Sequence, residues 1–290
     1  MPEILLHTLQ HTLLETVKLL PFLFLTYLLM EYLEHRSGSA TERLLRGSGR
    51  VGPVIGSVLG AVPQCGFSAA ASGLYAGRII TTGTLIAVYL STSDEMLPIL
   101  ISEGAPITVV LKILAIKIVI GMIAGFGVDG ISAILSARDE QDSHAHIEDI
   151  CEREHCNCED HFALSALKHT AYVTSFIFLV CFCLNFVVEI VGEETIASIV
   201  LDRPVLGNVV SALVGLIPNC ASSIILTELY LGGVIPMGAM MSGLLVNSGI
   251  ALTILFRNNR PLSDSFRILA ILFAIGLASG IIIDLTGLIG

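Results

Sequence analysis

Tryptophan is absent from the 290 residues, aromatic residues make up only 6% and charged residues only 14%. A soluble domain carries about 25% charged residues, so the low charge argues against a water-exposed globule. Hydrophobic residues make up 54% of the chain, and the mean hydropathy is +0.84. Apolar runs long enough to cross a bilayer recur along the sequence. The sequence therefore predicts an all-α polytopic membrane protein, whose interfacial aromatic belt must use Tyr and Phe.

Several catalytic and redox patterns are also missing. The chain has no phosphate-binding glycine loop, dinucleotide fingerprint or nucleic-acid-binding pattern, so we expect neither an enzyme nor a nucleic-acid partner. The seven Cys residues form no C-x-x-C motif and are odd in number, so free thiols or ligands are expected rather than disulfides. The N-terminus lacks a basic region and a small-residue cleavage site, so no signal peptide is expected. No cofactor is expected, and transport would use an ion gradient or a separate subunit.

Two proline triplets interrupt long apolar segments. Pro63-Gln64-Cys65 and Pro218-Asn219-Cys220 are each followed by small and hydroxyl residues. Proline breaks a helix because it lacks an N–H and its ring clashes with the preceding turn. The arms on either side, over 51–62 and 65–76 and within 206–231, are each too short to span a bilayer at 1.5 Å per residue. Each segment is therefore predicted to be a broken helical hairpin. The predicted site residues at these tips are Gln64, Cys65, Ser68, Asn219, Cys220, Ser222 and Ser223.

The two halves of the chain are an internal repeat. A shift of 155 residues superposes Pro63 on Pro218, Cys65 on Cys220 and Tyr75 on Tyr230. We expect the halves to be inverted-topology repeats, each with three spans plus one hairpin, or about ten helical segments in all. The expected spans are 13–33, 79–102, 106–136, 168–190, 233–256 and 266–288. The domains are 1–137 for the first repeat, 138–166 for a polar loop and 167–290 for the second repeat.

Charge bias orients the chain. The face that carries the 34–50 loop, Arg78, the central loop and the 257–267 link holds most of the 15 Lys and Arg residues. The positive-inside rule makes this face cytoplasmic. We therefore expect a multi-pass protein of the inner (plasma) membrane, with the central loop in the cytoplasm and both termini outside. The two hairpin tips then meet near the membrane midplane.

A second set of candidate residues lies in the middle of two spans. Ser91, Thr92, Ser93, Asp94 and Glu95 stand in the first half, and Asn247 and Ser248 are their partners in the second. Intramembrane carboxylates are costly and mark binding or proton sites. Adjacent side chains on a helix point about 100° apart, so only one carboxylate faces the site unless the helix unwinds, and Asp94 is favoured over Glu95. Lys112 and Lys117 are either counter-ions or snorkelling residues.

The central loop over 138–166 differs from the rest, with nine Asp or Glu, four His and three Cys. His and Cys are ligands for Zn-like metals, although the spacing matches no zinc finger. The loop is therefore either a metal-capturing element or an acidic linker. Its candidate ligands are His144, His146, Cys151, His155, Cys156, Cys158 and His161.

The P-Q-C-G and P-N-C repeat, the Ser91–Glu95 stretch and the His/Cys-rich loop together resemble the ten-helix heavy-metal exporter family. The resemblance covers about 13–288. Its members are usually described as arsenic efflux proteins or manganese transporters, so the resemblance implies export of a metal or metalloid across the bilayer.

The leading hypothesis is a proton-coupled secondary exporter of a divalent cation such as Mn²⁺. Carboxylates and amides outnumber thiols at the predicted site, and hard oxygen ligands suit such an ion. The first alternative is an arsenite or organoarsenical permease that uses Cys65 and Cys220. Further alternatives are a small-anion or sulfur-compound transporter and a membrane thiol oxidoreductase. The expected partners are the lipid bilayer and a small inorganic substrate, and a homodimer is left open.

Overall fold

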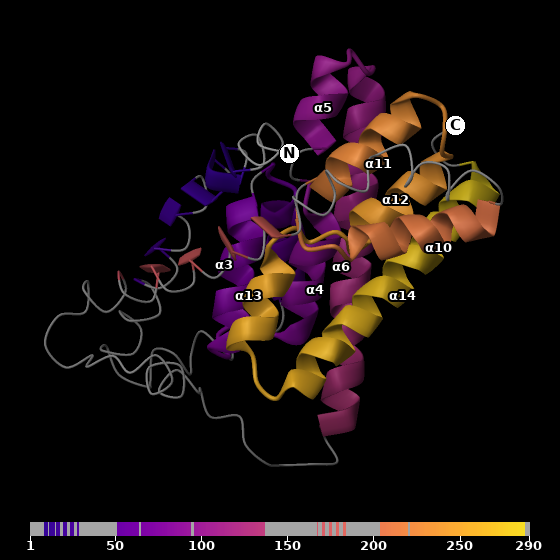
Figure 1. The fold of residues 1–290 in the computed structure, drawn as a ribbon. Helices are drawn as coiled ribbons and strands as arrows, with labels where there is room; N and C mark the ends of the chain where they lie inside the picture. The colour runs from indigo at the N-terminus through magenta and orange to yellow at the C-terminus, as the bar shows by residue number, and fades with distance from the viewer. Residues whose placement is uncertain are drawn as a thin grey trace, which may run out of the picture.

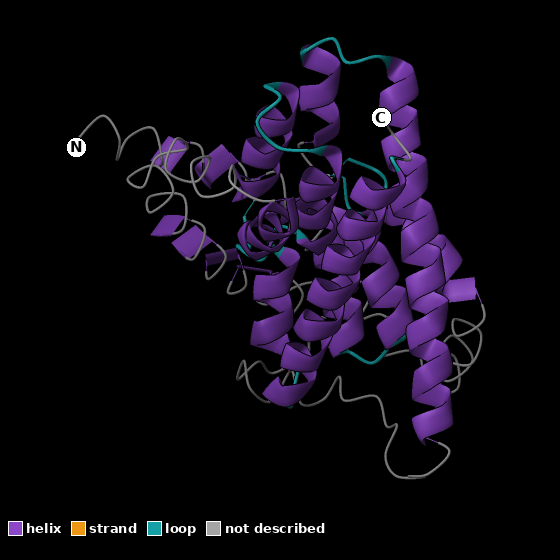
Figure 2. Ribbon diagram, turned by 90° about the vertical axis from the view of Figure 1, so that its right-hand side faces the viewer, coloured by secondary structure: helices purple, strands orange, loops and turns teal. Residues whose placement is uncertain are grey.

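The computed structural model describes residues 51–63, 65–93, 96–136, 204–219 and 221–287, with scattered helical positions between 9 and 28 and between 167 and 183. The described part is all helical, without a strand (Figure 2). Four of its helical segments are long and apolar enough to cross a membrane, and shorter apolar helices accompany them. The prediction of an all-α polytopic membrane protein is confirmed. The expected spans 13–33 and 168–190 lie mostly outside the described residues.

Figure 1 shows the arrangement of the helices. The first half contains a helix over Val51–Gly60, then α3 (Cys65–Ala76), α4 (Thr82–Ser91), α5 (Met96–Ser102) and α6 (Ile107–Ser136). The second half contains α10 (Pro204–Gly215), α11 (Ala221–Leu231), α12 (Met237–Val246), α13 (Ala251–Asn258) and α14 (Leu262–Thr286). The interruptions predicted at Pro63 and Pro218 are present, because helix ends at Gly60 and Gly215 and resumes at Cys65 and Ala221.

The helix bounds follow the shift of 155 residues found in the sequence. This shift carries the bounds of α4 onto those of α12, and the start of α6 onto that of α14. It also carries one capping contact onto another. The Gly83 amide donates to Asp129 Oδ1 at 2.7 Å, and the Gly238 amide donates to Asp284 Oδ1 at 2.7 Å. The two halves therefore begin their central helices with the same hydrogen bond.

Glycine makes this close packing possible in both halves. A Cβ atom at Gly83 would overlap the carbonyl oxygen of Gly125, and one at Gly238 would overlap that of Gly280. Only a residue without a side chain lets the two backbones approach this closely. α4 is thus held directly against α6, and α12 against α14.

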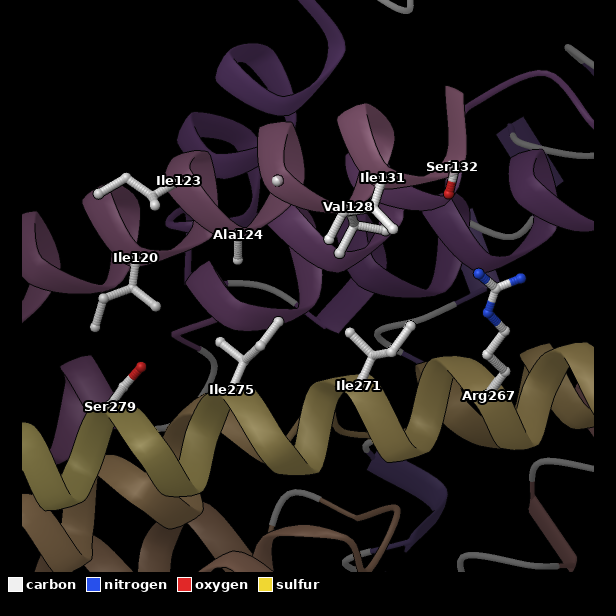
Figure 3. A pocket seen from close by; sticks show the side chains of 11 residues that line it. Ile120, Ile123, Ala124, Val128, Ile131, Ser132, Arg267, Ile271, Ile275 and Ser279 are labelled. Atoms are coloured by element: carbon white, nitrogen blue, oxygen red, sulfur yellow. The ribbon is translucent and has the colours of Figure 1, made fainter. Parts of the chain in front are cut away.

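The equivalent helices α6 and α14 run in opposite directions. Along the groove between them Ser132 lies near Arg267 at one end, and Ile120 lies near Ser279 at the other (Figure 3). Residue numbers therefore rise along α6 as they fall along α14. The two halves also pack against each other, because α13 of the second half contacts α3 of the first, and α5 of the first half contacts α11 of the second. The buried core is centred on α4 and α12, every residue of which is buried apart from Thr82 and Met237.

Two expected spans are not continuous helices. α4 ends at Ser91 and α5 starts at Met96, while α12 ends at Val246 and α13 starts at Ala251. Pro98 is the third residue of α5, where a proline is tolerated, but in a continuous helix it would clash with the preceding turn. Gly249 adopts a positive φ of 57° and its amide donates to Asn247 Oδ1, which ends α12. The expected spans over 79–102 and 233–256 are therefore present as the candidate membrane spans Thr82–Ser102 and Met237–Asn258, each interrupted inside the span.

Candidate functional site

The two interrupted helices meet at the side chain of Lys117. Its ammonium group, on α6, donates to the carbonyl oxygen of Thr92 and, at 3.1 Å, to that of Leu244. Thr92 caps the end of α4, and Leu244 belongs to the last turn of α12. Lys117 is 0% exposed. One buried cation therefore joins the end of a helix from the first half to the end of its equivalent in the second.

Helix electrostatics explain this placement. The last carbonyls of a helix have no partner within the helix and carry partial negative charge, which favours a cation there. A buried ammonium in turn needs acceptors to offset the loss of water. The equivalent position in the second half is Leu272, which is buried and apolar. The junction is thus asymmetric in charge. Lys117 is a buried donor to carbonyl oxygens, and its ammonium does not reach the surface.

The hydroxyl groups at and just after the end of α4 are buried and donate back to backbone carbonyls. Ser91 donates to the carbonyl of Ala87 at 2.8 Å, and Thr92 donates to that of Val88 at 2.8 Å. Ser93 donates to the carbonyl of Ser91 at 3.0 Å. Each hydroxyl proton is thereby used, but oxygen lone pairs remain. These groups can serve as oxygen ligands for a cation.

The equivalent segment in the second half contains a hydroxyl without a partner. Ser248 Oγ is buried and makes no hydrogen bond. A buried polar group left unpaired is costly, and most such groups in proteins find a partner. Asn247 is also buried, and its Oδ1 accepts the Gly249 amide at 2.8 Å. Ser248 is therefore the described side chain best placed to bind a substrate at this break.

The residues at the second hairpin tip cap a helix. Asn219 Oδ1 accepts from the amide of Ser222 at 3.2 Å and from its hydroxyl at 2.9 Å. Asparagine is a preferred N-cap for this reason. Ser68 and Ser223 are buried at equivalent positions, where their carbonyls accept hydroxyl protons from Ser72 and Thr227. Asn219 and Ser222 are therefore positioned by the fold of the tip itself.

A contact that the sequence analysis missed ties the first hairpin to the broken helix of the other half. Ser72 Oγ lies 2.7 Å from Tyr89 Oη and 2.9 Å from the carbonyl oxygen of Ala251. Ala251 is the first residue of α13. In the sequence Ser72 and Tyr89 are two of several polar residues in largely apolar helices, a signal too weak to identify them. The halves are therefore linked at two places next to the breaks: Lys117 contacts the ends of α4 and α12, and Ser72 contacts the start of α13.

Part of the predicted site lies outside the described residues. Gln64, Asp94, Glu95 and Cys220 are in this group, as are the loop candidates within 138–166. Cys65 begins α3, but its side chain is not described. Within the described ranges, no group of three or more His, Cys, Asp or Glu side chains could hold a metal ion. The metal-ligand assignments therefore stay predictions.

At one end of the molecule a polar cluster joins the halves. Asp264 Oδ2 accepts from Tyr75 Oη at 2.7 Å and from Asn259 Nδ2 at 2.9 Å, and it lies 3.6 Å from an Arg78 guanidinium nitrogen. Arg78 also donates to the carbonyl of Arg260 at 2.9 Å. We refer to these residues as the Arg78–Asp264 cluster. It connects the end of α3 with the start of α14.

A comparison with protein families identifies one match. The family model described as "Putative, 10TM heavy-metal exporter" matches residues 3–165 and 139–257, two overlapping stretches that cover most of the chain. No curated protein and no solved structure gives a significant match.

Proposed function

The chain belongs to the family of ten-helix (10TM) heavy-metal exporters, and on that premise we propose that it is a secondary transporter that exports a metal ion by alternating access. The observation that carries the proposal is the junction at Lys117. Broken helices with their ends at the centre of the protein are the usual ion sites of secondary transporters, where free carbonyls face the ion. In this chain an ammonium group occupies those carbonyls.

We expect the ammonium and the metal ion to compete for the same oxygens. A cation that approaches the ends of α4 and α12 must displace Lys117 from the carbonyls of Thr92 and Leu244. Two positive charges beside these buried carbonyl oxygens would repel each other strongly, because burial reduces the screening between them. Loss of the Lys117 proton would relieve the repulsion. This competition supports exchange of a proton for the exported ion.

The favoured substrate is a divalent cation such as Mn²⁺. The hydroxyl oxygens of Thr92, Ser93 and Ser248 are hard ligands, and Asp94 and Glu95 follow Ser93 directly in the chain. As a site residue, the favoured Asp94 would offset the charge of the Lys117 ammonium and add a hard oxygen ligand. Such a site suits manganese and similar ions better than soft ones.

The competing substrate is arsenite or an organoarsenical. Cys65 is the first residue of α3, and Cys220 directly precedes α11 at the equivalent position. Thiolates are the preferred ligands of soft metals and metalloids. The repeat of Cys65 at Cys220 after 155 residues of sequence is the observation that favours the alternative.

Alternating access in this proposal is a rocking of two inverted halves. The shift of 155 residues in helix bounds and the opposite directions of α6 and α14 support the inverted relation. The Arg78–Asp264 cluster would close one end, which the charge bias assigns to the cytoplasm of the inner (plasma) membrane. The central loop would then lie on the same side, where it could deliver metal to the site.

Flux through the purified protein in sealed vesicles tests the proposal. We expect a pH gradient to drive Mn²⁺ across the membrane, with a matching proton flux read from a trapped pH-sensitive dye. Vesicles with the Lys117→Met variant are expected to lose the proton flux. Absence of transport for Mn²⁺, other divalent metals and arsenite alike would refute metal export by this chain.

Two cysteine variants decide between the substrates. If Cys65→Ser and Cys220→Ser abolish arsenite transport but leave Mn²⁺ transport intact, the metalloid is the substrate of the thiol site. If both variants keep arsenite transport, or none exists, the thiols are packing residues. Deletion of 140–160 tests metal delivery, and unchanged transport at low metal concentration would make the loop a linker.

A further inference from the structure

A groove lies between α6 and α14, and none of its lining residues belongs to the junction at Lys117. It encloses about 610 Å³ and is lined on both sides by aliphatic residues such as Ile120, Val128, Ile271 and Ile275 (Figure 3). This volume lies in the range of about 300–1,000 Å³ that ligand pockets occupy. α6 and α14 are also the least enclosed of the candidate spans, with 22% and 28% of their most apolar stretches buried. The groove therefore opens toward the bilayer.

A single cationic side chain stands at one end of this groove. Arg267 projects from the first turns of α14 toward Ser132 on α6 (Figure 3). Arg267 is exposed, and no carboxylate of the described residues pairs with it. An arginine on an otherwise apolar surface calls for an anionic partner, which its planar fork binds through paired hydrogen bonds.

The length of the groove matches one leaflet of a membrane. From Ser132 to Ile120, and likewise from Arg267 to Ser279, the helices rise about 18 Å at 1.5 Å per residue. Half of a hydrocarbon core is about 15 Å thick. Arg267 then lies near the headgroups and Ser279 near the midplane. An acyl chain that spans one leaflet would fit the length of the groove, and its negative headgroup would lie beside Arg267.

We propose that this groove binds an anionic phospholipid, with the phosphate on Arg267 and Ser132 and an acyl chain along Ile271 and Ile275. A second copy of this chain fits less well, because a packed helix would cover the guanidinium without supplying a charge. The charge bias of the sequence places Arg267 on the cytoplasmic side, where anionic lipids are concentrated. The proposal does not depend on which ion is transported.

Native mass spectrometry of the purified protein tests the proposal. The protein is offered equal amounts of phosphatidylglycerol and phosphatidylcholine with identical acyl chains. We expect the wild type to retain phosphatidylglycerol preferentially. Arg267→Gln should reduce that preference about fivefold, since one basic residue near the membrane surface contributes on the order of a fivefold change in affinity. Phosphatidylcholine binding should change little.

The pseudo-symmetric partner of Arg267 supplies the matched control. Lys112 is shifted from it by 155 residues, is exposed on α6 and does not line the groove. Lys112→Gln removes the same charge and should leave the lipid preference intact. Ile275→Trp fills the groove and should exclude both lipids, with thermal unfolding in detergent as a check on folding.

Four outcomes would overturn the assignment. Equal retention of the two lipids by the wild type would show that the groove does not select an anionic headgroup. An unchanged preference in Arg267→Gln would show that Arg267 does not bind it. If Arg267→Gln and Lys112→Gln lose the preference for phosphatidylglycerol equally, the preference comes from the overall charge of the protein and not from the groove. A dimer in wild-type protein that Ile275→Trp dissociates would mean that a second copy covers the groove.

Discussion

Lys117 shows how one residue can connect binding to movement. Its ammonium holds the ends of α4 and α12 together while it occupies the oxygens that a metal ion would use. A substrate that displaces Lys117 therefore also releases the contact between the halves. In the proposed mechanism, binding and rearrangement would be coupled through this one group, as alternating access requires.

The first prediction concerns the charge of Lys117. Lys117→Met should abolish proton flux linked to metal transport, because it removes the titratable donor to the carbonyls of Thr92 and Leu244. It should also lower the free energy of unfolding by about 1–3 kcal/mol, since two buried carbonyls lose a partner. Dye-based proton flux and thermal unfolding measure the two effects.

Lys117→Arg is the matched control for charge, and we expect it to fold but to transport without releasing a proton. A Lys117→Met variant whose metal flux still follows the pH gradient would contradict the role assigned to Lys117. Coupling would then have to reside elsewhere, with Asp94 as the next candidate.

The second prediction uses the unpaired hydroxyl of Ser248. Ser248→Ala should raise the free energy of unfolding by about 1–3 kcal/mol, because it removes a buried group with no hydrogen bond. The same change should weaken metal binding, measured by calorimetry. Thr253→Val is the control, since Thr253 Oγ1 is also buried and unpaired but lies inside α13. It should stabilise the protein without affecting affinity. A loss of stability in Ser248→Ala would show that the hydroxyl is structural.

At the scale of helices, the two carboxylate caps hold the central pair in place. Asp129 accepts from the Gly83 amide and from the Thr81 hydroxyl, both at 2.7 Å. Asp284 accepts from the Gly238 amide and from Asn208 Nδ2, again both at 2.7 Å. Each negative charge sits at the start of a helix, where the free amides favour it. The caps fix how far α4 and α12 can slide along α6 and α14.

The third prediction compares these caps. Asp129→Ala and Asp284→Ala should each reduce the free energy of unfolding by about 1–2 kcal/mol, as for loss of a helix N-cap. Because each carboxylate accepts the equivalent glycine amide and one further donor, the two losses should be similar in thermal unfolding measurements. Glu103→Ala, at an exposed turn, should have little effect. If only one of the two variants loses stability, the two carboxylates contribute unequally to the free energy of unfolding although both accept a glycine amide at the same distance.

At the scale of the whole molecule, the two ends of the transporter are not alike. The shift of 155 residues carries Tyr75 onto Tyr230, Arg78 onto Gly233 and Asn259 back onto Gly104. It carries Asp264 back onto Val109, so the Arg78–Asp264 cluster has no charged equivalent at the other end. Among the described residues, this cluster joins the halves at one end, and its equivalent positions at the other end carry no charge.

The fourth prediction tests this asymmetry. Asp264→Asn should weaken the contacts from Tyr75, Asn259 and Arg78 at once and shift the population toward a state open at that end. Hydrogen–deuterium exchange of the amides in 74–84 and 256–264 should become faster, by about two- to tenfold for a change near 1 kcal/mol. Exchange near 102–106, at the opposite end, serves as the internal control. Equal acceleration at both ends would indicate general destabilisation instead of gating.

Local features of the sequence were sufficient for the membrane class, the breaks at Pro63 and Pro218 and the spacing of 155 residues. Apolar length, a missing N–H and a repeated pattern act within a few turns of helix, so each can be predicted without knowing what packs against it. Pro98 and Gly249 lie next to the interruptions between α4 and α5 and between α12 and α13, which the structure located inside the expected spans.

Tertiary structure alone decided the partners. Lys117 could be seen as a charge in an apolar run, but its acceptors lie on two other helices, one of them 127 residues away along the chain. The cap of Gly83 by Asp129, the packing of α13 on α3 and the isolation of Ser248 depend equally on long-range contacts. A buried ammonium or carboxylate is stable only beside a complementary group. The sequence determines that such a group must exist, and the fold determines which one it is.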